Sequence, residues 1–232
     1  MKLLAFETAT EACSVAVWAD GDVCERFELA PRRHAELALP WAEQLLAEAG
    51  IAKSQLDAIA VGRGPGAFTG VRLAIALAQG IALALDRPVL PVSTLAALAM
   101  RAQGNRIVAA IDARMGEVYC AAFARSGDDL LALGDEVVAK PDSARIPDGA
   151  DWHGVGSGFA AADDALQAHL HGRLASVDVG ALPHAADVAR LAALAFTRGE
   201  AIAPERIEPA YLRNNVALTT VEQQALRAAR KP

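Results

Sequence analysis

Short apolar runs and one long helical pattern alternate through the first hundred residues. Runs of strand length predict a three-strand meander at 2–6, 12–18 and 23–29. A helix ended by Gly50, a further strand and a longer helix follow at 34–49, 57–61 and 71–85. A strand and a helix capped by Ser93 complete the pattern at 89–92 and 95–102. This order of elements predicts a ribonuclease-H-like lobe.

The second half of the chain begins with the same pattern as the first. "LLAFETATEACSVAV" (3–17) aligns without a gap on "VAAIDARMGEVYCAA" (108–122), and Glu7 falls on Asp112. A repeated strand, acid, turn and strand indicates two lobes of one ancestral fold. We therefore predict a first lobe, a smaller second lobe and a C-terminal tail helix at 1–103, 104–212 and 213–232.

Fewer elements are predicted in the second lobe, because the stretch that follows its first two strands is rich in loop residues. The remaining strands and helices are expected at 151–155, 174–177, 158–170 and 185–197. The tail helix is predicted to open on a capping box from Thr219 to Glu222.

The loop "GRGPGAFTG" (62–70) lies between a strand and a helix, where many proteins hold phosphate. It contains no lysine, so it is not a P-loop. It matches the relaxed dinucleotide pattern, but the nearest acid, Asp86, precedes the next strand instead of following it. A positioning role is favoured, with positive φ at Gly64 and Gly66 and with Thr69 capping the helix. Free amides there leave a weak anion site as the alternative.

The helix predicted after this loop is almost wholly apolar. Arg72 and Gln79 are seven residues apart and share one face with Ile75, Ala76 and Leu83. A surface helix normally carries a broad polar face. Burial within one domain and coverage by another subunit explain the pattern equally well. Because large apolar patches are rare on monomers, we expect a homodimer when the chain is alone.

The composition is that of a folded globular protein, with 53% hydrophobic and 22% charged residues. The net charge is -6 and no basic stripe is present, so tight binding to RNA or DNA by this chain alone is not expected. Three dispersed cysteines without a CxxC pair indicate reduced thiols. The N-terminal apolar run is too short for a signal peptide, and the longest apolar segment is shorter than a membrane span. We expect a cytoplasmic protein without membrane contact.

Candidate chemistry is limited to two acids and one glycine. Glu7 and Asp112 occupy the turns that hold magnesium and a nucleophile in two-lobe nucleotide-binding folds; the alternative is a carboxylate bonded to nearby amides. Gly156, in "GVGSGF", could approach an adenosine. No histidine pair has the spacing of a metal site, and no metal is expected.

Six segments together resemble the bacterial TsaB (YeaZ-like) family nearly end to end. They are "FETAT", "RRHAELALP", "GRGPGAFTGVRLAIALAQGIA", "PVSTLAALA", "IDARMGEVYCAAF" and "PAYLRNNVA", starting at residues 6, 32, 62, 91, 111 and 209. The resemblance implies an α/β, two-lobe, actin-like (ASKHA) fold with a reduced second lobe. It also implies a role in forming N6-threonylcarbamoyladenosine at position 37 of tRNA.

In that family the transfer is catalysed by the paralogue TsaD, which holds the metal, and an ATPase, TsaE, joins the assembly. The resemblance therefore implies a non-catalytic scaffold that docks on TsaD through helices of its first lobe. Such a scaffold would bind no cofactor alone, would share any nucleotide with its partner and would meet tRNA only within the complex. The expected interface residues are His34, Leu37, Trp41, Arg72, Ile75, Ala76, Ala78, Gln79 and Leu83.

Two features of this sequence bear on the hypothesis of a non-catalytic scaffold. His34 stands alone in its helix, with Ala38 one turn later, so no histidine pair is available for a metal. Glu7 replaces the commoner aspartate of the family's "DTAT" pattern, which argues further against a nucleotide bound by this lobe. The alternative function is an enzyme, a metal-dependent glycoprotease-like peptidase or nucleotide hydrolase, that uses Glu7 and Asp112.

Overall fold

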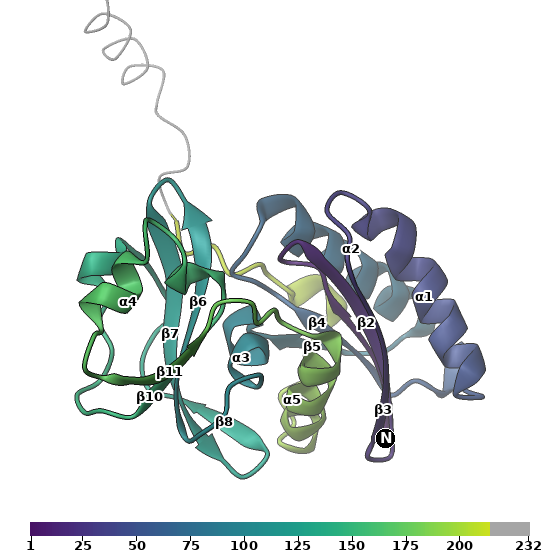
Figure 1. Cartoon of the computed structure of the whole chain (residues 1–232). Helices are drawn as coiled ribbons and strands as arrows, with labels where there is room; N and C mark the ends of the chain where they lie inside the picture. The colour runs from purple at the N-terminus through teal and green to yellow at the C-terminus, as the bar shows by residue number, and fades with distance from the viewer. Residues whose placement is uncertain (214–232) are drawn as a thin grey trace, which may run out of the picture.

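The first lobe is built on a five-stranded mixed sheet (Figure 1). The computed structural model describes residues 1–213. The strands, in the sheet order β3-β2-β1-β4-β5, are Asp22–Leu29, Ala12–Ala19, Lys2–Glu7, Ala58–Gly62 and Val89–Val92. The meander β1 to β3 is antiparallel, and β4 and β5 run parallel to β1. The predicted strands of this lobe are confirmed.

Both faces of this sheet are covered by helices, which explains the uninterrupted apolar run of β1. Leu4 and Phe6 pack toward α1 (His34–Glu48) and α2 (Phe68–Leu85). Leu3 and Ala5, which alternate with them, pack toward α5 (Ala185–Thr197) on the opposite face. A strand buried on both sides needs apolar residues at every position.

The helix starts are set by the residues just before them. Ser93 caps α3 (Thr94–Ala99), because its hydroxyl accepts a hydrogen bond from the Ala96 amide at 3.1 Å, as predicted. The predicted cap at Thr69 is wrong. α2 begins earlier, at Phe68, after Ala67, which offers no side-chain cap.

The second lobe repeats the strand order of the first, which confirms the predicted duplication. Its strands, in the order β11-β10-β6-β7-β8, are Leu174–Asp178, Trp152–Val155, Arg106–Arg114, Glu117–Ser126 and Asp129–Ala132. A short strand β9 (Val137–Ala139) pairs with β7. The fold is thus the expected α/β, two-lobe, actin-like arrangement of ribonuclease-H-like lobes.

The second lobe is reduced because its helices are short. Where the first lobe has α1, this lobe has one 3-10 turn, Pro141–Ser143. The predicted helix over 158–170 is wrong: a 3-10 turn at Ser157–Phe159 is followed by a turn and then by α4 (Ala165–His169). Three consecutive residues with positive φ, Ala162 to Asp164, separate the two, and no α-helix can pass through that conformation.

The chain returns to the first lobe after β11, which the predicted division at 103/104 did not anticipate. The buried alanines of α5, among them Ala185, Ala189 and Ala192, pack against the first sheet. Beyond α5, Ile202 pairs with Val89 at the edge of that sheet, with the Val89 amide 2.9 Å from the Ile202 carbonyl. Residues from 185 to 202 therefore belong spatially to the first lobe. The predicted tail helix, with Thr219 and Glu222, lies outside the described residues.

α2 has 18 residues and a mean hydropathy of 1.7, so it is long and apolar enough to cross a membrane. The prediction that the longest apolar segment is too short for a membrane span is therefore wrong. In this structure α2 lies on the sheet of the first lobe beside α1. A helix of this composition is also common in the core of soluble folds, and one such helix is weak evidence for a membrane.

Candidate functional site

Glu7 is buried at the carboxyl end of β1 and joins this strand to α3. Its Oε1 accepts a hydrogen bond from the Ala9 amide at 2.7 Å, and its Oε2 accepts one from the Thr94 hydroxyl at 2.9 Å. Burial raises the pKa of Glu7 to about 7, although both hydrogen bonds lower it. The carboxyl group is thus committed to contacts within its own lobe.

The glycine loop lies directly against the β1–β2 turn. A Cβ at Gly62 would collide with the Glu7 carboxyl group, and a Cβ at Gly66 or Gly70 would collide with the Ala9 or Thr8 carbonyl. The positions therefore require glycine for close backbone approach. Of the two positive φ angles predicted, only that of Gly64, at +91°, is present.

Hydrogen bonds hold the loop in this position. The Ala67 amide donates to the Ala9 carbonyl at 2.7 Å, and the Thr8 hydroxyl donates to the Gly70 carbonyl at 2.7 Å. The Gly64 amide donates to Thr94 Oγ1 at 3.2 Å. These contacts hold the loop against the β1–β2 turn, in agreement with the predicted positioning role.

Asp112, at the end of β6, bonds to its own turn. Its two oxygens accept hydrogen bonds from the Arg114 amide at 2.8 Å and the Arg114 guanidinium at 2.9 Å. Asp112 thus has the alternative role considered in the sequence analysis, that of a carboxylate bonded to groups of its own turn. Within residues 1–213, no three His, Cys, Asp or Glu side chains are grouped so that they could hold a metal ion.

The second glycine motif is explained by packing. Gly156 has a φ of +103°, and a Cβ there would collide with the Ala110 carbonyl and the Leu98 side chain. A Cβ at Gly158 would lie 2.7 Å from that of Ala110. Glycine at these two positions therefore permits close packing against β6 and α3.

The expected interface residues of α1 are partly used inside the chain. His34 Nε2 lies 3.0 Å from the Thr10 carbonyl and 3.1 Å from the Ala12 carbonyl. Carbonyl oxygens only accept, so Nε2 carries the proton and fastens the start of α1 to the β1–β2 turn. Leu37 and Trp41 are half-buried against the core below α1 and α2.

α2 divides into a core side and an outer side, and the sequence did not separate them. Ile75 and Ala78, expected at an interface, are buried in the first lobe and are corrected to core residues. Gln79 is half-buried, and its amide donates to the Pro204 carbonyl at 2.9 Å. Residues on the outer side are Phe68, Thr69, Arg72, Ala76, Gly80, Leu83 and Ala84.

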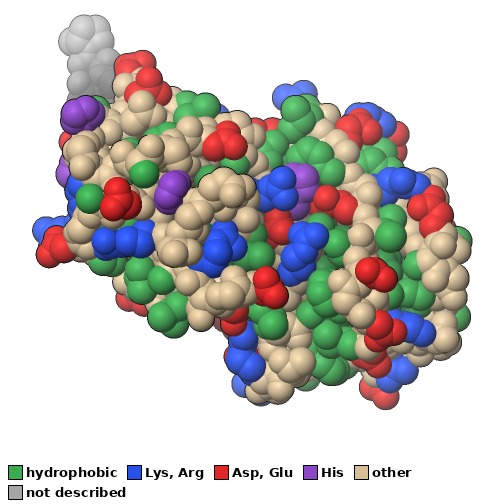
Figure 2. Space-filling view, turned by 60° about the horizontal axis from the view of Figure 1, so that its bottom comes forward, with side chains coloured by type: hydrophobic (Ala, Val, Ile, Leu, Met, Phe, Trp, Pro, Cys, Tyr) green, Lys and Arg blue, Asp and Glu red, His purple; other side chains and the backbone are tan. Residues whose placement is uncertain are grey.

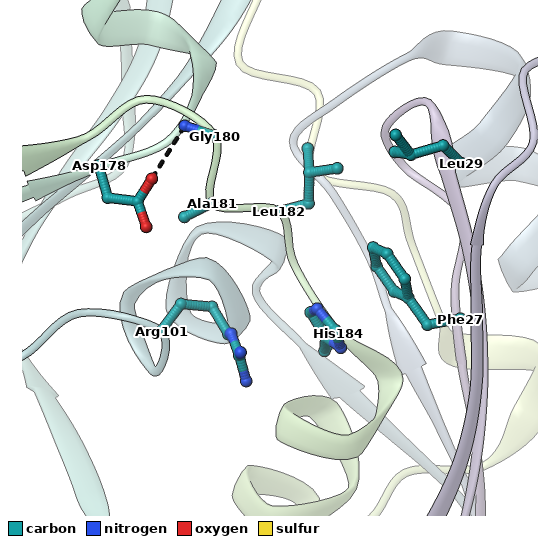
Figure 3. Close-up of a pocket in the computed structure, with 8 residues that line it drawn as sticks. All are labelled: Phe27, Leu29, Arg101, Asp178, Gly180, Ala181, Leu182 and His184. Atoms are coloured by element: carbon teal, nitrogen blue, oxygen red, sulfur yellow. Dashed lines mark hydrogen bonds between the residues drawn. The ribbon is translucent and has the colours of Figure 1, made fainter.

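A separate hollow of about 340 Å³ lies between the lobes (Figure 3). His184, just before α5, stacks on Phe27 of β3 with ring centroids 4.0 Å apart. Arg101, which follows α3, closes another side. Figure 3 shows these side chains converging from three separate elements.

A partly buried polar network supports one side of this hollow. Glu25 accepts hydrogen bonds from the Ser14 hydroxyl at 2.6 Å and the Ala186 amide at 2.9 Å, and its Oε2 lies 2.8 Å from His184 Nδ1. Burial alone would raise the pKa of Glu25, but the bonds to His184, Ser14 and Ala186 outweigh burial and lower it. Sequence reasoning missed this network, because Glu25 and His184 are 159 residues apart and no local pattern links them.

Figure 2 shows acidic and basic side chains interspersed on one face of the molecule. That face carries no continuous basic stripe, as the net charge of -6 suggests. A duplicated strand order, with the first glycine loop packed against the β1–β2 turn, defines an actin-like protein.

Comparison with known proteins assigns the chain to a family. The family model described as TsaD, tRNA N6-adenosine threonylcarbamoyltransferase, matches residues 28–221. The tRNA threonylcarbamoyladenosine biosynthesis protein TsaB of Escherichia coli K12 is 43% identical over 226 residues, covering 94% of this chain and 96% of that protein. TsaB of Haemophilus influenzae is 39% identical, covering 93% and 95%.

The solved structure of YeaZ from Pseudomonas aeruginosa has a TM-score of 0.84 and 46% identity, covering 91% of this chain and 99% of that one. A second Pseudomonas aeruginosa structure, of a protein with similarity to peptidase YEAZ, has a TM-score of 0.86 and 46% identity. The chain belongs to the TsaB (YeaZ) family, within the wider group that the TsaD model describes.

Proposed function

We propose that this chain is a cytoplasmic, non-catalytic scaffold subunit in the formation of N6-threonylcarbamoyladenosine at position 37 of tRNA. In this role it binds and activates a TsaD-type transferase, and a TsaE-type ATPase joins the complex. tRNA is contacted only through the assembly. Membership of the TsaB family supports the pathway, and the outer side of α2 supports the docking role.

The observation that carries the proposal is the scarcity of polar residues on the outer side of α2, where the exposed ones are Thr69 and Arg72. Arg72 is its single charged residue in 18 positions. Leu83 is 51% exposed, and small residues, Ala76, Gly80 and Ala84, lie beside it. A solvated helix face is normally polar. Small residues also allow a second helix to approach closely, so a protein partner accounts for both features.

The TsaD model matches this chain, so a TsaD-type transferase shares its fold and presents equivalent helices. Two related chains can therefore meet through the same surface in a pseudo-symmetric pair. A second copy of this chain can occupy the same surface, and we propose a homodimer that competes with the heterodimer. Any nucleotide would be bound at the boundary with the transferase.

The alternative is an enzyme that uses Glu7 and Asp112, either a peptidase or a nucleotide hydrolase. The near-neutral pKa of Glu7 favours it, since such a carboxyl group suits proton transfer. The burial of Glu7 beneath Gly62 opposes it. Calorimetric titration with ATP and magnesium separates the two functions: micromolar binding by the purified chain alone would favour the enzyme.

The docking proposal is tested with Leu83→Glu, which places a charge on the outer side of α2. Leu131→Glu on β8 is the matched control, because Leu131 is 61% exposed on the other lobe. Size-exclusion chromatography with light scattering measures complex formation with the transferase. We expect the first variant to lose the complex and the second to keep it. If Leu83→Glu still co-elutes with the transferase, the docking surface is placed wrongly.

A further inference from the structure

An exposed cluster of two aromatic rings and one arginine lies at the start of α2. The guanidinium carbon of Arg72 is 3.2 Å from the ring centroid of Phe68 and 5.2 Å from that of Tyr211. Phe68 is 59% exposed and Tyr211 is 51% exposed. Two segments far apart in the sequence therefore present one surface.

Tyr211 is held in place from both lobes. In the first lobe, the amide of the preceding Ala210 donates to the Arg63 carbonyl at 2.8 Å. In the second lobe, Arg213 forms an ion pair with Glu117 and donates to the Ala113 carbonyl at 3.2 Å. Residues 209–213, here called the strap, thus cross from one lobe to the other, and the residues on either side of Tyr211 are anchored.

The positive charge of Arg72 is not neutralised within the described residues 1–213, because no carboxylate there forms an ion pair with it. Its guanidinium lies over the Phe68 ring and near that of Tyr211. A guanidinium held flat on a ring keeps its outward N–H groups in a fixed geometry, which suits a carboxylate. Arginine and aromatic residues are also the types that dominate binding energy at protein interfaces.

We propose that Phe68, Arg72 and Tyr211 form the anchor of the docking surface and receive a carboxylate flanked by apolar residues on the TsaD-type partner. This inference rests on the proposed function and extends it, because the partner then contacts α2 and the strap together. The cluster continues the exposed apolar side of α2, one turn before Ala76. Its fixed geometry lowers the ordering cost of binding.

The test is a calorimetric titration of the TsaD-type transferase with the full chain and single variants. We expect Tyr211→Ala to weaken binding about 10-fold or more, as for an anchor residue. Arg72→Lys keeps the charge but loses the flat stacking, and we expect a similar loss. Leu131→Ala, the matched control on β8, should bind like the unmodified chain. Thermal unfolding shows whether each variant remains folded.

A fourth variant, Arg213→Ala, tests the strap without altering the anchor residues themselves. We expect weaker binding than in the unmodified chain, together with faster hydrogen exchange of the amides of residues 210–212. Unchanged binding and exchange would overturn the positioning part of the inference.

Leu83→Glu separates this inference from the proposed function. If it abolishes binding while Tyr211→Ala and Arg72→Lys bind normally, docking on α2 stands and the anchor is refuted. If the unmodified chain does not bind the transferase, the proposed function and the anchor both fail. If the anchor variants lose affinity for tRNA and not for the transferase, the surface binds nucleic acid, and the inference is overturned.

Discussion

Replacing Glu7 by glutamine should make the protein more stable at pH 8. In the folded chain the pKa of Glu7 is about 7, against an ordinary value of 4.5. The folded state therefore binds the proton more tightly than the unfolded state does. The stability that this provides is fully present below pH 4.5 and is lost as the pH rises through about 7.

The size of the effect follows from the two pKa values. At about 1.4 kcal/mol per pH unit, their difference amounts to about 3 kcal/mol of unfolding free energy. Most of this loss falls between pH 5 and pH 8. Glutamine is neutral throughout, still accepts from the Ala9 amide, and offers Thr94 Oγ1 an N–H in place of the protonated carboxyl group.

Urea unfolding of both proteins at pH 5, 6, 7 and 8 measures the difference. One protein concentration is used throughout, because the proposed homodimer would make stability depend on concentration. We expect similar stability at pH 5 and an advantage of about 2–3 kcal/mol for Glu7→Gln at pH 8. Glu11→Gln is the matched control, since Glu11 is exposed in the same turn. A difference between Glu7→Gln and the unmodified chain that stays constant from pH 5 to pH 8 would refute the reasoning.

Two further predictions concern packing and thiol exposure. Gly70→Ala should lower the free energy of unfolding by more than about 2 kcal/mol, because its Cβ would collide with the Thr8 carbonyl. Gly80→Ala, in open space on α2, should raise it by about 0.5–1 kcal/mol, and chemical denaturation compares the two. Cys24 is exposed and should be alkylated in the native protein. Cys13 and Cys120, whose thiol pKa values burial raises to about 11 and about 12, should react only after unfolding; mass spectrometry locates the label.

Much of the fold could be predicted because its signals are local. The strands of the first lobe are short apolar runs, except β3, which mixes polar and apolar residues. The repeated strand and acid pattern indicated the second lobe. The break between Ser157–Phe159 and α4 could not be predicted, since three consecutive left-handed residues have no glycine to mark them. The destination of α5 depends on long-range packing, which no local pattern encodes.

The candidate site was predictable to a similar extent. The glycine loop's positioning role followed from the absence of a lysine and of a correctly placed acid. The orientation of α2 did not follow, because a helix with one charged residue has no polar face to mark its outer side. Ile75 and Ala78 were misplaced for this reason. Tyr211 was missed as a neighbour of Arg72 because 139 positions separate them in the printed sequence.

The return of α5 to the first sheet has a consequence for biosynthesis. A ribosome must translate nearly 200 residues before the helix that covers one face of the first sheet is available. Until then Leu3, Ala5 and Ala58 remain uncovered on the nascent chain. The amino-terminal half cannot complete its hydrophobic core while it is being made, so we expect both halves to acquire their final structure together, late in translation.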